Sequence, residues 1–236
     1  MRRFQGLVVF SVLLAGYAWS QATSALETDA RGWIDLLSDK SLKGWTRVPV
    51  PPSAALGEVS QWKVDSASGN LICDGDKTGH EMLRYDREFD DFILHAEFRF
   101  TAREGDARYN SGVYVRNSAD GSIWHQAQVG SSSGGFLFGN TPVKGIAQRI
   151  NLREQVKENR VRPAGEWNTF EIRAEGPKIS LWVNGAVTCE YDRCEVARGY
   201  VALEAEGFRI EFRNLKLKEL RPRQSSTAGT QGSEAR

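Results

Sequence analysis

The chain has 236 residues, of which 40% are hydrophobic and 26% charged, and its formal net charge is +1. A charge so close to zero argues against binding of nucleic acid through a basic surface, and the balanced composition argues against a disordered chain. The length suits one large all-β domain or two small domains, and the 23 Gly and 7 Trp are typical of tight turns between aromatic-rich strands.

The beginning of the chain has the features of a secretory signal peptide. Two arginines precede an apolar run over residues 7–18, and small residues follow it. We predict a signal peptide over residues 1–20, cleaved after Ser20 or as late as Ala22 or Ala25. The alternative is a membrane anchor, but the run is shorter than the roughly 20 residues that a spanning helix needs. The prediction places the mature protein in the periplasm or outside the cell, without membrane association after cleavage.

Alternation of apolar and polar residues predicts a series of β-strands along the rest of the chain. The clearest example runs from Phe92 to Phe100, where every second residue is apolar. Further strands are predicted at residues 113–116, 123–129, 170–173, 179–183, 201–205 and 210–213. The dipeptide Asn184-Gly185 predicts a hairpin turn.

Three segments depart from this alternation. Residues 130–150 are rich in Gly and Ser and include Pro142, so we expect a long functional loop there. Residues 152–158 could form about two helical turns. Residues 221–236 have no apolar period and indicate a disordered tail. The folded domain is therefore expected over residues 27–220, as an all-β, two-sheet sandwich or jelly roll.

The cysteines are few and only two of them are close in sequence. Cys189 and Cys194 enclose four residues and, in an exported protein, could close a small disulfide loop. The alternative is two reduced thiols. Cys73 stands in an apolar stretch, so we expect a buried thiol there. No second Cys/His pair has the spacing of a zinc site.

Polar faces on three consecutive predicted strands carry side chains suited to a sugar. They are Glu97 and Arg99 on the first strand, Tyr114 and Arg116 on the second, and Trp124, Gln126 and Gln128 on the third. If these strands are neighbours, the faces converge on one side of a sheet. Amide and guanidinium groups would hold hydroxyls there, and aromatic rings would stack on C–H surfaces. The alternative for Glu97 with Arg99 is a cross-strand charge pair in water.

Four more residues lie near this predicted face. Asn110 stands at the start of the second strand, where its side chain can reach a ligand. Glu204 and Glu206 are either solvated charges at a strand end or part of the rim of the same cleft. His125 has the parity of the apolar face, so it is either a core histidine or a ligand contact at the end of its strand. No GxSxG or HExxH motif is present.

Six short segments occur in a characteristic order and spacing. They are GWIDLL with LKGW in residues 32–45, DFILHAEFR in 91–99, NSGVYVR in 110–116, GEWNTFE in 165–171, VNG in 183–185 and IEFRNL in 210–215. This set resembles the 3-keto-disaccharide hydrolase domain family over residues 32–220. The resemblance implies a concanavalin A-like jelly roll and an exported protein that acts on sugars already oxidised at C3. Where many members carry a Glu before the strand Gln, this chain has Gln126 beside Gln128.

The resemblance predicts cleavage of the glycosidic bond of 3-keto-glycosides or 3-keto-disaccharides. A ketone at C3 acidifies the C2 proton, so a base can remove it, the group at C1 can leave, and water can add afterwards. We assign Glu97 as the base and Arg116 as the stabiliser of the developing oxyanion. Asn110, Trp124 and Gln128 are assigned as principal sugar contacts.

Cofactor and partner expectations follow from the same residues. No metal-ligand spacing is present, so no cofactor is indicated, although a divalent metal held by His125 and a Glu would suit the chemistry. The expected partner is a small carbohydrate or glycoside, not nucleic acid. The alternative function is a non-catalytic carbohydrate-binding module on a lectin-like jelly roll, and a third is an exported scaffold domain.

Overall fold

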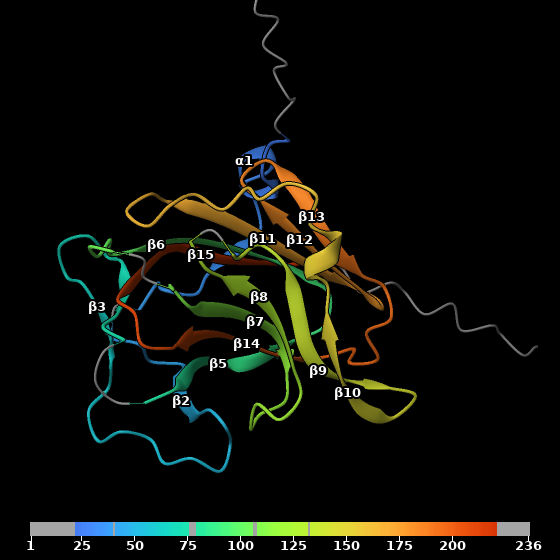
Figure 1. Cartoon of the computed structure of the whole chain (residues 1–236), viewed down its shortest axis with the longest axis horizontal. Helices are drawn as coiled ribbons and strands as arrows, with labels where there is room; N and C mark the ends of the chain where they lie inside the picture. The colour runs from blue at the N-terminus through green and yellow to red at the C-terminus, as the bar shows by residue number, and fades with distance from the viewer. Residues whose placement is uncertain (1–21, 40, 76–78, 106–107, 132, 221–236) are drawn as a thin grey trace, which may run out of the picture.

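The protein is a sandwich of two antiparallel sheets (Figure 1). The computed structural model describes residues 22–39, 41–75, 79–105, 108–131 and 133–220. In these ranges, no helix is long and apolar enough to cross a membrane. The prediction of a two-sheet, all-β sandwich is confirmed.

Both sheets are built from strands far apart in the sequence. The eight-stranded sheet has the order β13 (Ala186–Tyr191), β12 (Lys178–Val183), β11 (Asn168–Glu175), β6 (Phe92–Phe100), β15 (Ile210–Glu219), β4 (Leu71–Cys73) and β3 (Trp62–Val64), with β1 (Trp33–Asp35) paired to β15. The seven-stranded sheet has the order β10 (Ile146–Asn151), β9 (Leu137–Val143), β8 (Trp124–Val129), β7 (Ser111–Asn117), β14 (Gly199–Ala205), β5 (Glu81–Phe89) and β2 (Trp45–Pro49). The helical elements are α1 (Ala25–Thr28) and a 3₁₀ turn, η1 (Arg153–Gln155).

The core lies between the sheets because each strand turns one set of alternate residues inward. On β6 the inward residues include Phe92 and Phe98, both fully buried. Phe98 packs edge-on against Phe170 of β11, with ring centroids 4.8 Å apart. On β7 the inward residues are Val113 and Val115, also fully buried. The remaining alternate residues of β7 and of its neighbouring strands form the outer face of this sheet.

The segment expected to be one long loop is half strand. Residues 137–151 form the hairpin of β9 and β10, which turns at Lys144-Gly145, where both residues have positive φ. The Gly- and Ser-rich part before residue 137 keeps the character of a loop. The expected helix over 152–158 is reduced to η1, since that stretch has no apolar stripe to bury. The hairpin turn at Asn184-Gly185 is confirmed.

The prediction of a disulfide between Cys189 and Cys194 is wrong, because both residues are reduced thiols with separate partners. Cys189 accepts a hydrogen bond from the backbone N–H of Leu137, and burial raises its pKa to about 11. Cys194 donates to the carbonyl of Val196, and its sulfur lies 3.4 Å from Nε2 of His125. Cys73 is buried, as expected.

Two predicted segments lie outside the described residues. They are the signal peptide over 1–20 and the tail over 221–236. Ordered contacts begin before the expected domain start at residue 27, because the backbone N–H of Ala22 donates to the carbonyl of Gly185.

Candidate functional site

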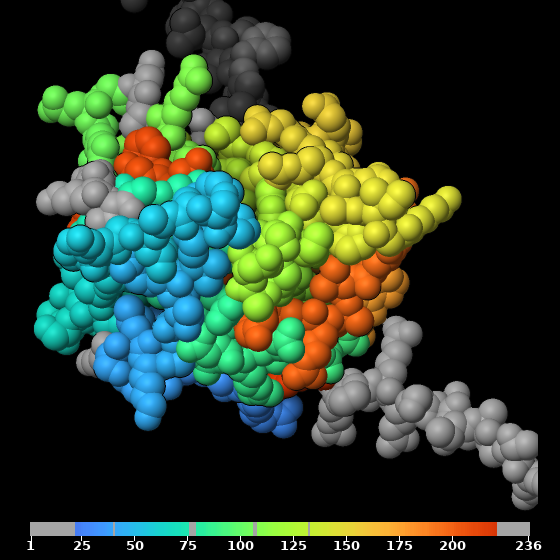
Figure 2. Space-filling model, turned by 90° about the horizontal axis from the view of Figure 1, so that it is seen from below, coloured from blue at the N-terminus to red at the C-terminus, as the bar shows by residue number. Residues whose placement is uncertain are grey.

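A pocket of about 470 Å³ opens on the outer face of the seven-stranded sheet. Figure 2 shows this side of the molecule, with the cyan segment after β2 on one side of the sheet face and the yellow segment of β9 and β10 on the other. The floor consists of even-numbered residues of β7 and β8, because their odd-numbered neighbours fill the core. The polar and aromatic lining residues are His80, Asn110, Tyr114, Ser122, Trp124, Gln126, Gln128, Phe138, Arg149, Glu204 and Glu206.

Glu204 is a buried carboxylate at the centre of a hydrogen-bond network, with 3% of its surface exposed. Its Oε1 accepts from His80 Nε2 at 2.7 Å and from the Tyr114 hydroxyl. Its Oε2 accepts from Gln126 Nε2 at 2.5 Å. Burial and the charge of Glu204 raise the pKa of Tyr114, so the phenol remains a hydrogen-bond donor. Three donors hold this carboxylate in one orientation.

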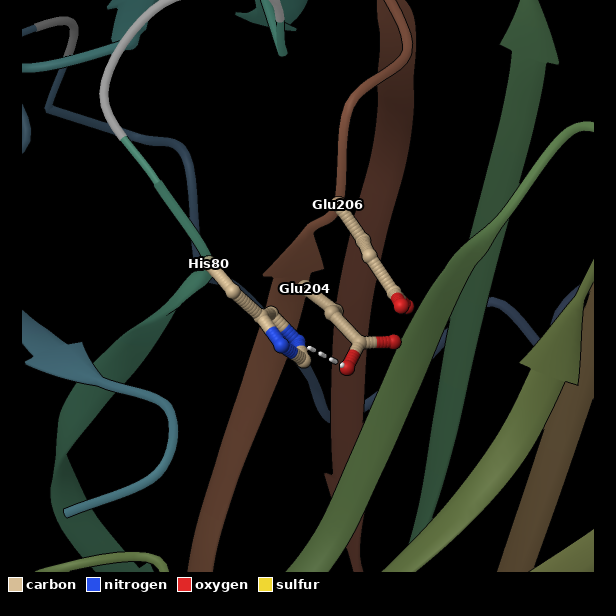
Figure 3. Close-up of side chains that lie close together, drawn as sticks. All are labelled: His80, Glu204 and Glu206. Atoms are coloured by element: carbon tan, nitrogen blue, oxygen red, sulfur yellow. Dashed lines mark hydrogen bonds and ion pairs between the residues drawn. The ribbon is translucent and has the colours of Figure 1, made fainter. Parts of the chain in front are cut away.

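Glu206 lies beside Glu204, as Figure 3 shows, and in that view the dashed contact to His80 comes from Glu204. Burial raises its pKa, and the negative charge of Glu204 raises it further. The charge of His80 and a hydrogen bond with Asn110 partly oppose this shift. Asn110 in turn accepts from Gln128 Nε2 at 2.5 Å. Glu206 therefore combines a raised proton affinity with access to the pocket, which suits a group that takes up and releases a proton.

The same acidic end could hold a divalent cation. One ligand atom each from His80, Glu204 and Glu206 lies within 4.8 Å of the other two. One imidazole and two carboxylates are a common donor set for such ions, and three protein ligands leave positions for water or substrate. The expected metal ligand His125 is not part of this group.

The opposite end of the pocket has aromatic walls. The rings of Trp124 and Phe138 pack edge to face with centroids 5.0 Å apart, and the Tyr114 ring packs edge to face with Trp124 at 5.9 Å. The guanidinium carbon of Arg149 lies 4.7 Å from the centroid of the Trp124 ring. Amides and carboxylates at one end and aromatic rings at the other are the surfaces by which proteins hold sugars.

Seven of the predicted site residues line this pocket. They are Asn110, Tyr114, Trp124, Gln126, Gln128, Glu204 and Glu206. Four others lie elsewhere: Glu97, Arg99, Arg116 and His125. The expectation that all three polar faces converge is thus right for the strands β7 and β8, which pair, and wrong for β6, which belongs to the other sheet.

Glu97 and Arg99 lie on the outer face of the eight-stranded sheet. Glu97 accepts hydrogen bonds from Arg213 at 2.7 Å and Asn214 at 2.6 Å. Burial alone would raise the pKa of Glu97, but the nearby His95, 3.7 Å away, and hydrogen bonds from Asn214 and Arg213 lower it to about 2. Arg99 pairs with Glu211 at 3.1 Å. Glu97 and Arg99 therefore form cross-strand charge pairs, as the alternative interpretation predicted, because β6 belongs to the sheet that does not carry the pocket.

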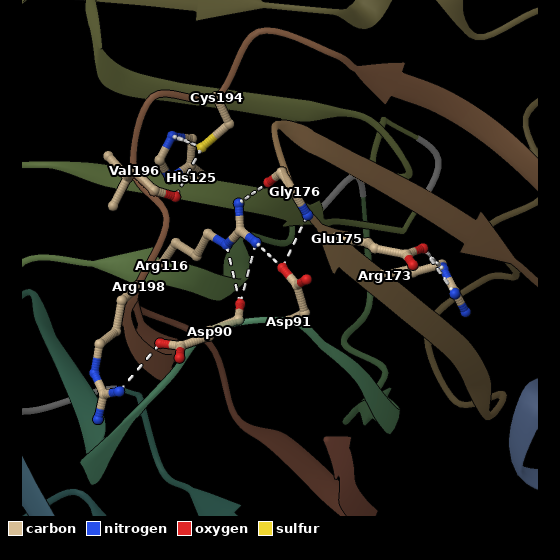
Figure 4. Close-up of polar contacts among 10 residues, drawn as sticks. All are labelled: Asp90, Asp91, Arg116, His125, Arg173, Glu175, Gly176, Cys194, Val196 and Arg198. Atoms are coloured by element: carbon tan, nitrogen blue, oxygen red, sulfur yellow. Dashed lines mark hydrogen bonds and ion pairs between the residues drawn. The ribbon is translucent and has the colours of Figure 1, made fainter. Parts of the chain in front are cut away.

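Arg116 is fully buried and is not one of the residues that line the pocket. Figure 4 shows its guanidinium between Asp90, Asp91 and Gly176. Its guanidinium donates to the carbonyls of Asp90 at 3.1 Å and Gly176 at 2.6 Å and to the carboxylate of Asp91 at 3.0 Å. Its backbone has φ of 50°, next to an irregularity in the pairing of β7 with β14, so its side chain does not follow the parity of Tyr114. The structure thus gives Arg116 partners in two turns and none in the pocket.

His125 points into the core, as its parity suggested. Its Nδ1 lies 3.3 Å from the carbonyl oxygen of Val115, and its Nε2 lies 2.7 Å from the hydroxyl of Thr141. Burial lowers the pKa of His125 to about 4, so the ring is neutral near pH 7. Of the two interpretations, the structure shows the core histidine.

Four of the polar and aromatic lining residues were not predicted from the sequence: His80, Ser122, Phe138 and Arg149. His80 precedes β5, a strand whose charged residues hide the alternation, and it lies 124 positions from Glu204. Arg149 lies on β10, within the segment expected to be a loop. The rarity of histidine in the chain was the one available signal, since His80 is one of three.

The fold and this pocket define a carbohydrate-related jelly-roll domain. The chain matches the model of the 3-keto-alpha-glucoside-1,2-lyase-like domain over residues 32–218 and belongs to that family. The resemblance seen in the sequence is thereby confirmed. No curated protein matches the chain.

Solved structures share the fold at low sequence identity. One is a protein from Parabacteroides distasonis provisionally described as a glycosyl hydrolase, with a TM-score of 0.59, 16% identity, and coverage of 85% of this chain and 99% of that one. Another is the carbohydrate-binding module CBM66 from Bacillus subtilis, with a TM-score of 0.54, 16% identity, and coverage of 75% and 96%. At such identities the likeness concerns the fold alone.

Proposed function

We propose that the protein is exported and that its pocket binds 3-keto-glycosides or 3-keto-disaccharides and cleaves their glycosidic bond by elimination. The observation that carries the proposal is the pair of unlike carboxylates, Glu204 held by three donors and Glu206 with a raised pKa. Family membership supports the substrate class. The pocket volume of about 470 Å³ lies in the range of small-ligand sites.

The reaction begins at the C2 proton, which the neighbouring C3 ketone acidifies. Glu206 takes this proton, and the electron pair forms an enolate across C2 and C3. When the ketone re-forms, a double bond appears between C1 and C2 and the C1–O bond breaks. The leaving oxygen takes up a proton, and addition of water across the new double bond yields the free 3-keto sugar. The overall result equals hydrolysis.

Each residue has a role that its surroundings support. Glu206 is the base because its raised pKa makes it more basic than an ordinary carboxylate. Glu204 positions His80, and this pairing raises the pKa of His80 although burial alone would lower it. His80 is thus a proton donor for the leaving oxygen. Asn110 and Gln128 hold hydroxyls of the sugar beside the base.

A divalent cation would also fit the same end of the pocket, held by His80, Glu204 and Glu206. It would replace the proton-transfer roles of His80 and Glu206, because side chains bound to a metal do not exchange that proton. When bound, such an ion would polarise the C3 ketone and favour enolate formation. Chelation followed by readdition of Mg²⁺, Mn²⁺ or Co²⁺ in the assay below shows whether turnover depends on it.

The test is incubation of purified protein with 3-keto-trehalose or a 3-keto-glucoside in D₂O, followed by NMR. We expect a free 3-keto sugar that carries deuterium at C2. Glu206→Gln should lower the rate by roughly 100-fold or more, because it removes the base. Glu97→Gln is the matched control and should keep full activity, since Glu97 lies on the other sheet. Unchanged turnover in Glu206→Gln would reject the assignment.

A binding module without chemistry is the second candidate, supported by the aromatic walls at Trp124 and Phe138. It predicts binding of the sugar by calorimetry without any product. It further predicts that Glu206→Gln binds at least as well as the unmodified protein, because no proton needs to be removed.

A further inference from the structure

Arg149 is a cation at the end of the pocket opposite the carboxylates. It lies on the edge strand β10, paired with Asn140 of β9, which is paired in turn with Trp124 of β8. This register places the three residues in one row across the sheet. From there the guanidinium reaches over the Trp124 ring, 4.7 Å from its centroid, and forms part of the pocket lining.

The charge of Arg149 has no carboxylate partner among the described residues, in contrast to other arginines that stack on tryptophan. Arg99 and Arg213 both stack on Trp167, on the other sheet. Each of them also pairs with a glutamate, at 3.1 Å and 2.7 Å. Over the described part of the chain, no acidic oxygen lies within 4.0 Å of the Arg149 guanidinium. Its donors therefore face solvent and the pocket.

The two ends of the pocket are far enough apart for two linked groups. The acidic end is marked by Gln128, which bonds Asn110 beside Glu206. At the rise of a β-strand, Trp124 lies about 13 Å from Gln128 and about 7 Å from Gln126, which donates to Glu204. A reacting sugar held by Glu206 would thus direct its C1 substituent toward the Trp124 and Arg149 end.

We infer that Arg149 and Trp124 form a subsite for a leaving group that carries a carboxylate, such as an acidic sugar or an aromatic acid. The inference rests on the proposed function and extends it to the substrate class. A guanidinium over an indole ring keeps its N–H edge available, and that edge matches a carboxylate in a two-pronged hydrogen bond. The indole ring supplies an apolar surface for the body of the same group.

The test compares two 3-keto-glucosides that differ in one substituent, one of 4-carboxyphenol and one of 4-(hydroxymethyl)phenol. We expect the unmodified protein to prefer the carboxylate in kcat/KM. Arg149→Gln should reduce that preference roughly tenfold or more, the value of a charged hydrogen bond, and hardly change the neutral substrate. Arg153→Gln is the control, because Arg153 stacks on Phe136 without lining the pocket.

A second measurement separates this inference from the proposed function. Calorimetric titration of both glucosides into the Glu206→Gln variant, with and without Arg149→Gln, gives the same preference as a ratio of Kd. Absence of turnover by the unmodified protein would reject the proposed function, yet a carboxylate preference in Kd that depends on Arg149 would still support the subsite. Equal preference with and without Arg149 in both measurements would overturn the inference.

Discussion

Glu204 and Glu206 stand two residues apart, yet their surroundings make them chemically different. Glu204 ends β14 and is surrounded by donors from three other strands or strand ends. Glu206 follows the strand and lies near the charge of Glu204, which the charge of His80 and a hydrogen bond with Asn110 offset only in part. Burial beside a like charge raises a carboxyl pKa, whereas three donors fix the orientation of a carboxylate.

Gly112 makes room for this arrangement. A Cβ at Gly112 would lie 2.0 Å from Nε2 and 2.6 Å from Cγ of Gln126, so the whole Gln126 side chain would have to leave Glu204. We predict that Gly112→Ala lowers the free energy of unfolding by about 1–3 kcal/mol and lowers turnover as well. Urea denaturation and the NMR assay measure the two effects.

The control for this prediction is the double variant Gly112→Ala with Gln126→Ala. Since the clashing side chain is then absent, the added methyl group should cost little stability compared with Gln126→Ala alone. An equal loss of stability in both backgrounds would contradict the proposed clash.

His125 gives the stability of the protein a dependence on pH. Burial lowers its pKa from 6.5 to about 4, so the folded state holds a neutral ring where the unfolded chain would be protonated. Its stabilising contribution is complete above pH 6.5 and falls away as the pH drops toward 4, by up to about 3 kcal/mol. Urea midpoints between pH 4 and 7.5 should show this loss. A His125→Gln variant with an equally steep acid loss would argue against His125 as its source.

At the scale of elements, α1 depends on the sheet beneath it, because a helix of four residues is unstable by itself. Ser24 caps the helix, because its hydroxyl oxygen accepts a hydrogen bond from the backbone N–H of Glu27. Both carboxylate oxygens of Glu171, on β11, accept from the backbone N–H groups of Ala25 and Leu26, at 2.6 and 3.1 Å. Glu171 also accepts from His95 at 2.8 Å. Cleavage of a signal peptide after Ser20 would leave these contacts intact.

We predict that Glu171→Gln releases α1 and costs about 2 kcal/mol of stability, since a buried charged acceptor of three hydrogen bonds is lost. Hydrogen exchange at residues 25–28 should accelerate and the urea midpoint should fall. Glu175→Gln is the matched control on the same strand, because its pair with Arg173 is exposed. Similar effects of both substitutions would contradict the special role of Glu171.

The His95–Glu171 contact has the opposite pH dependence to His125. Burial alone would lower the pKa of His95, but its hydrogen bond to Glu171 and the nearby carboxylate of Glu97, 3.7 Å from its Nε2, raise it. Its contribution is therefore complete below pH 6.5 and is lost as the pH rises through the raised value. In Glu171→Gln, stability should depend less on pH on the alkaline side of 6.5.

Whether a strand could be predicted from the sequence depended on how clearly apolar and polar residues alternate along it. β6 was predicted from Phe92 to Phe100 because its inward face is wholly apolar. β5 was missed because it carries charged residues at positions 81, 84 and 86–88, with Glu81 buried only through its pairing with Arg47. β10 was missed because it is an exposed edge strand, where nothing requires an apolar face.

At the scale of the molecule, Arg116 joins the two sheets at one end of the sandwich. It extends from β7 of the seven-stranded sheet to the turn between β11 and β12 of the other, at Gly176, and to the β5–β6 turn at Asp90 and Asp91. We predict that Arg116→Met destabilises the protein by about 3–5 kcal/mol, because Asp91 and two carbonyls lose their donor.

Turnover distinguishes this structural role from a catalytic role of Arg116 as oxyanion stabiliser. In conditions where the Arg116→Met variant is folded, the turnover rate per folded molecule should equal that of the unmodified protein. If the folded variant instead turned over substrate more slowly by roughly 100-fold or more, Arg116 would act on the oxyanion after all. Circular dichroism measures the folded fraction in the same samples.

The sequence by itself determined the class of fold, the family and most of the pocket floor. Strand alternation and ordered turn motifs are local properties, and alternation alone places Tyr114, Gln126 and Gln128 opposite the core. The order of strands in a sheet is decided by long-range pairing that no local pattern encodes. Only the tertiary structure could therefore show that Glu97 lies on the other sheet and that Arg116 points away from the pocket. It alone also shows that His80 and Arg149 line the same pocket.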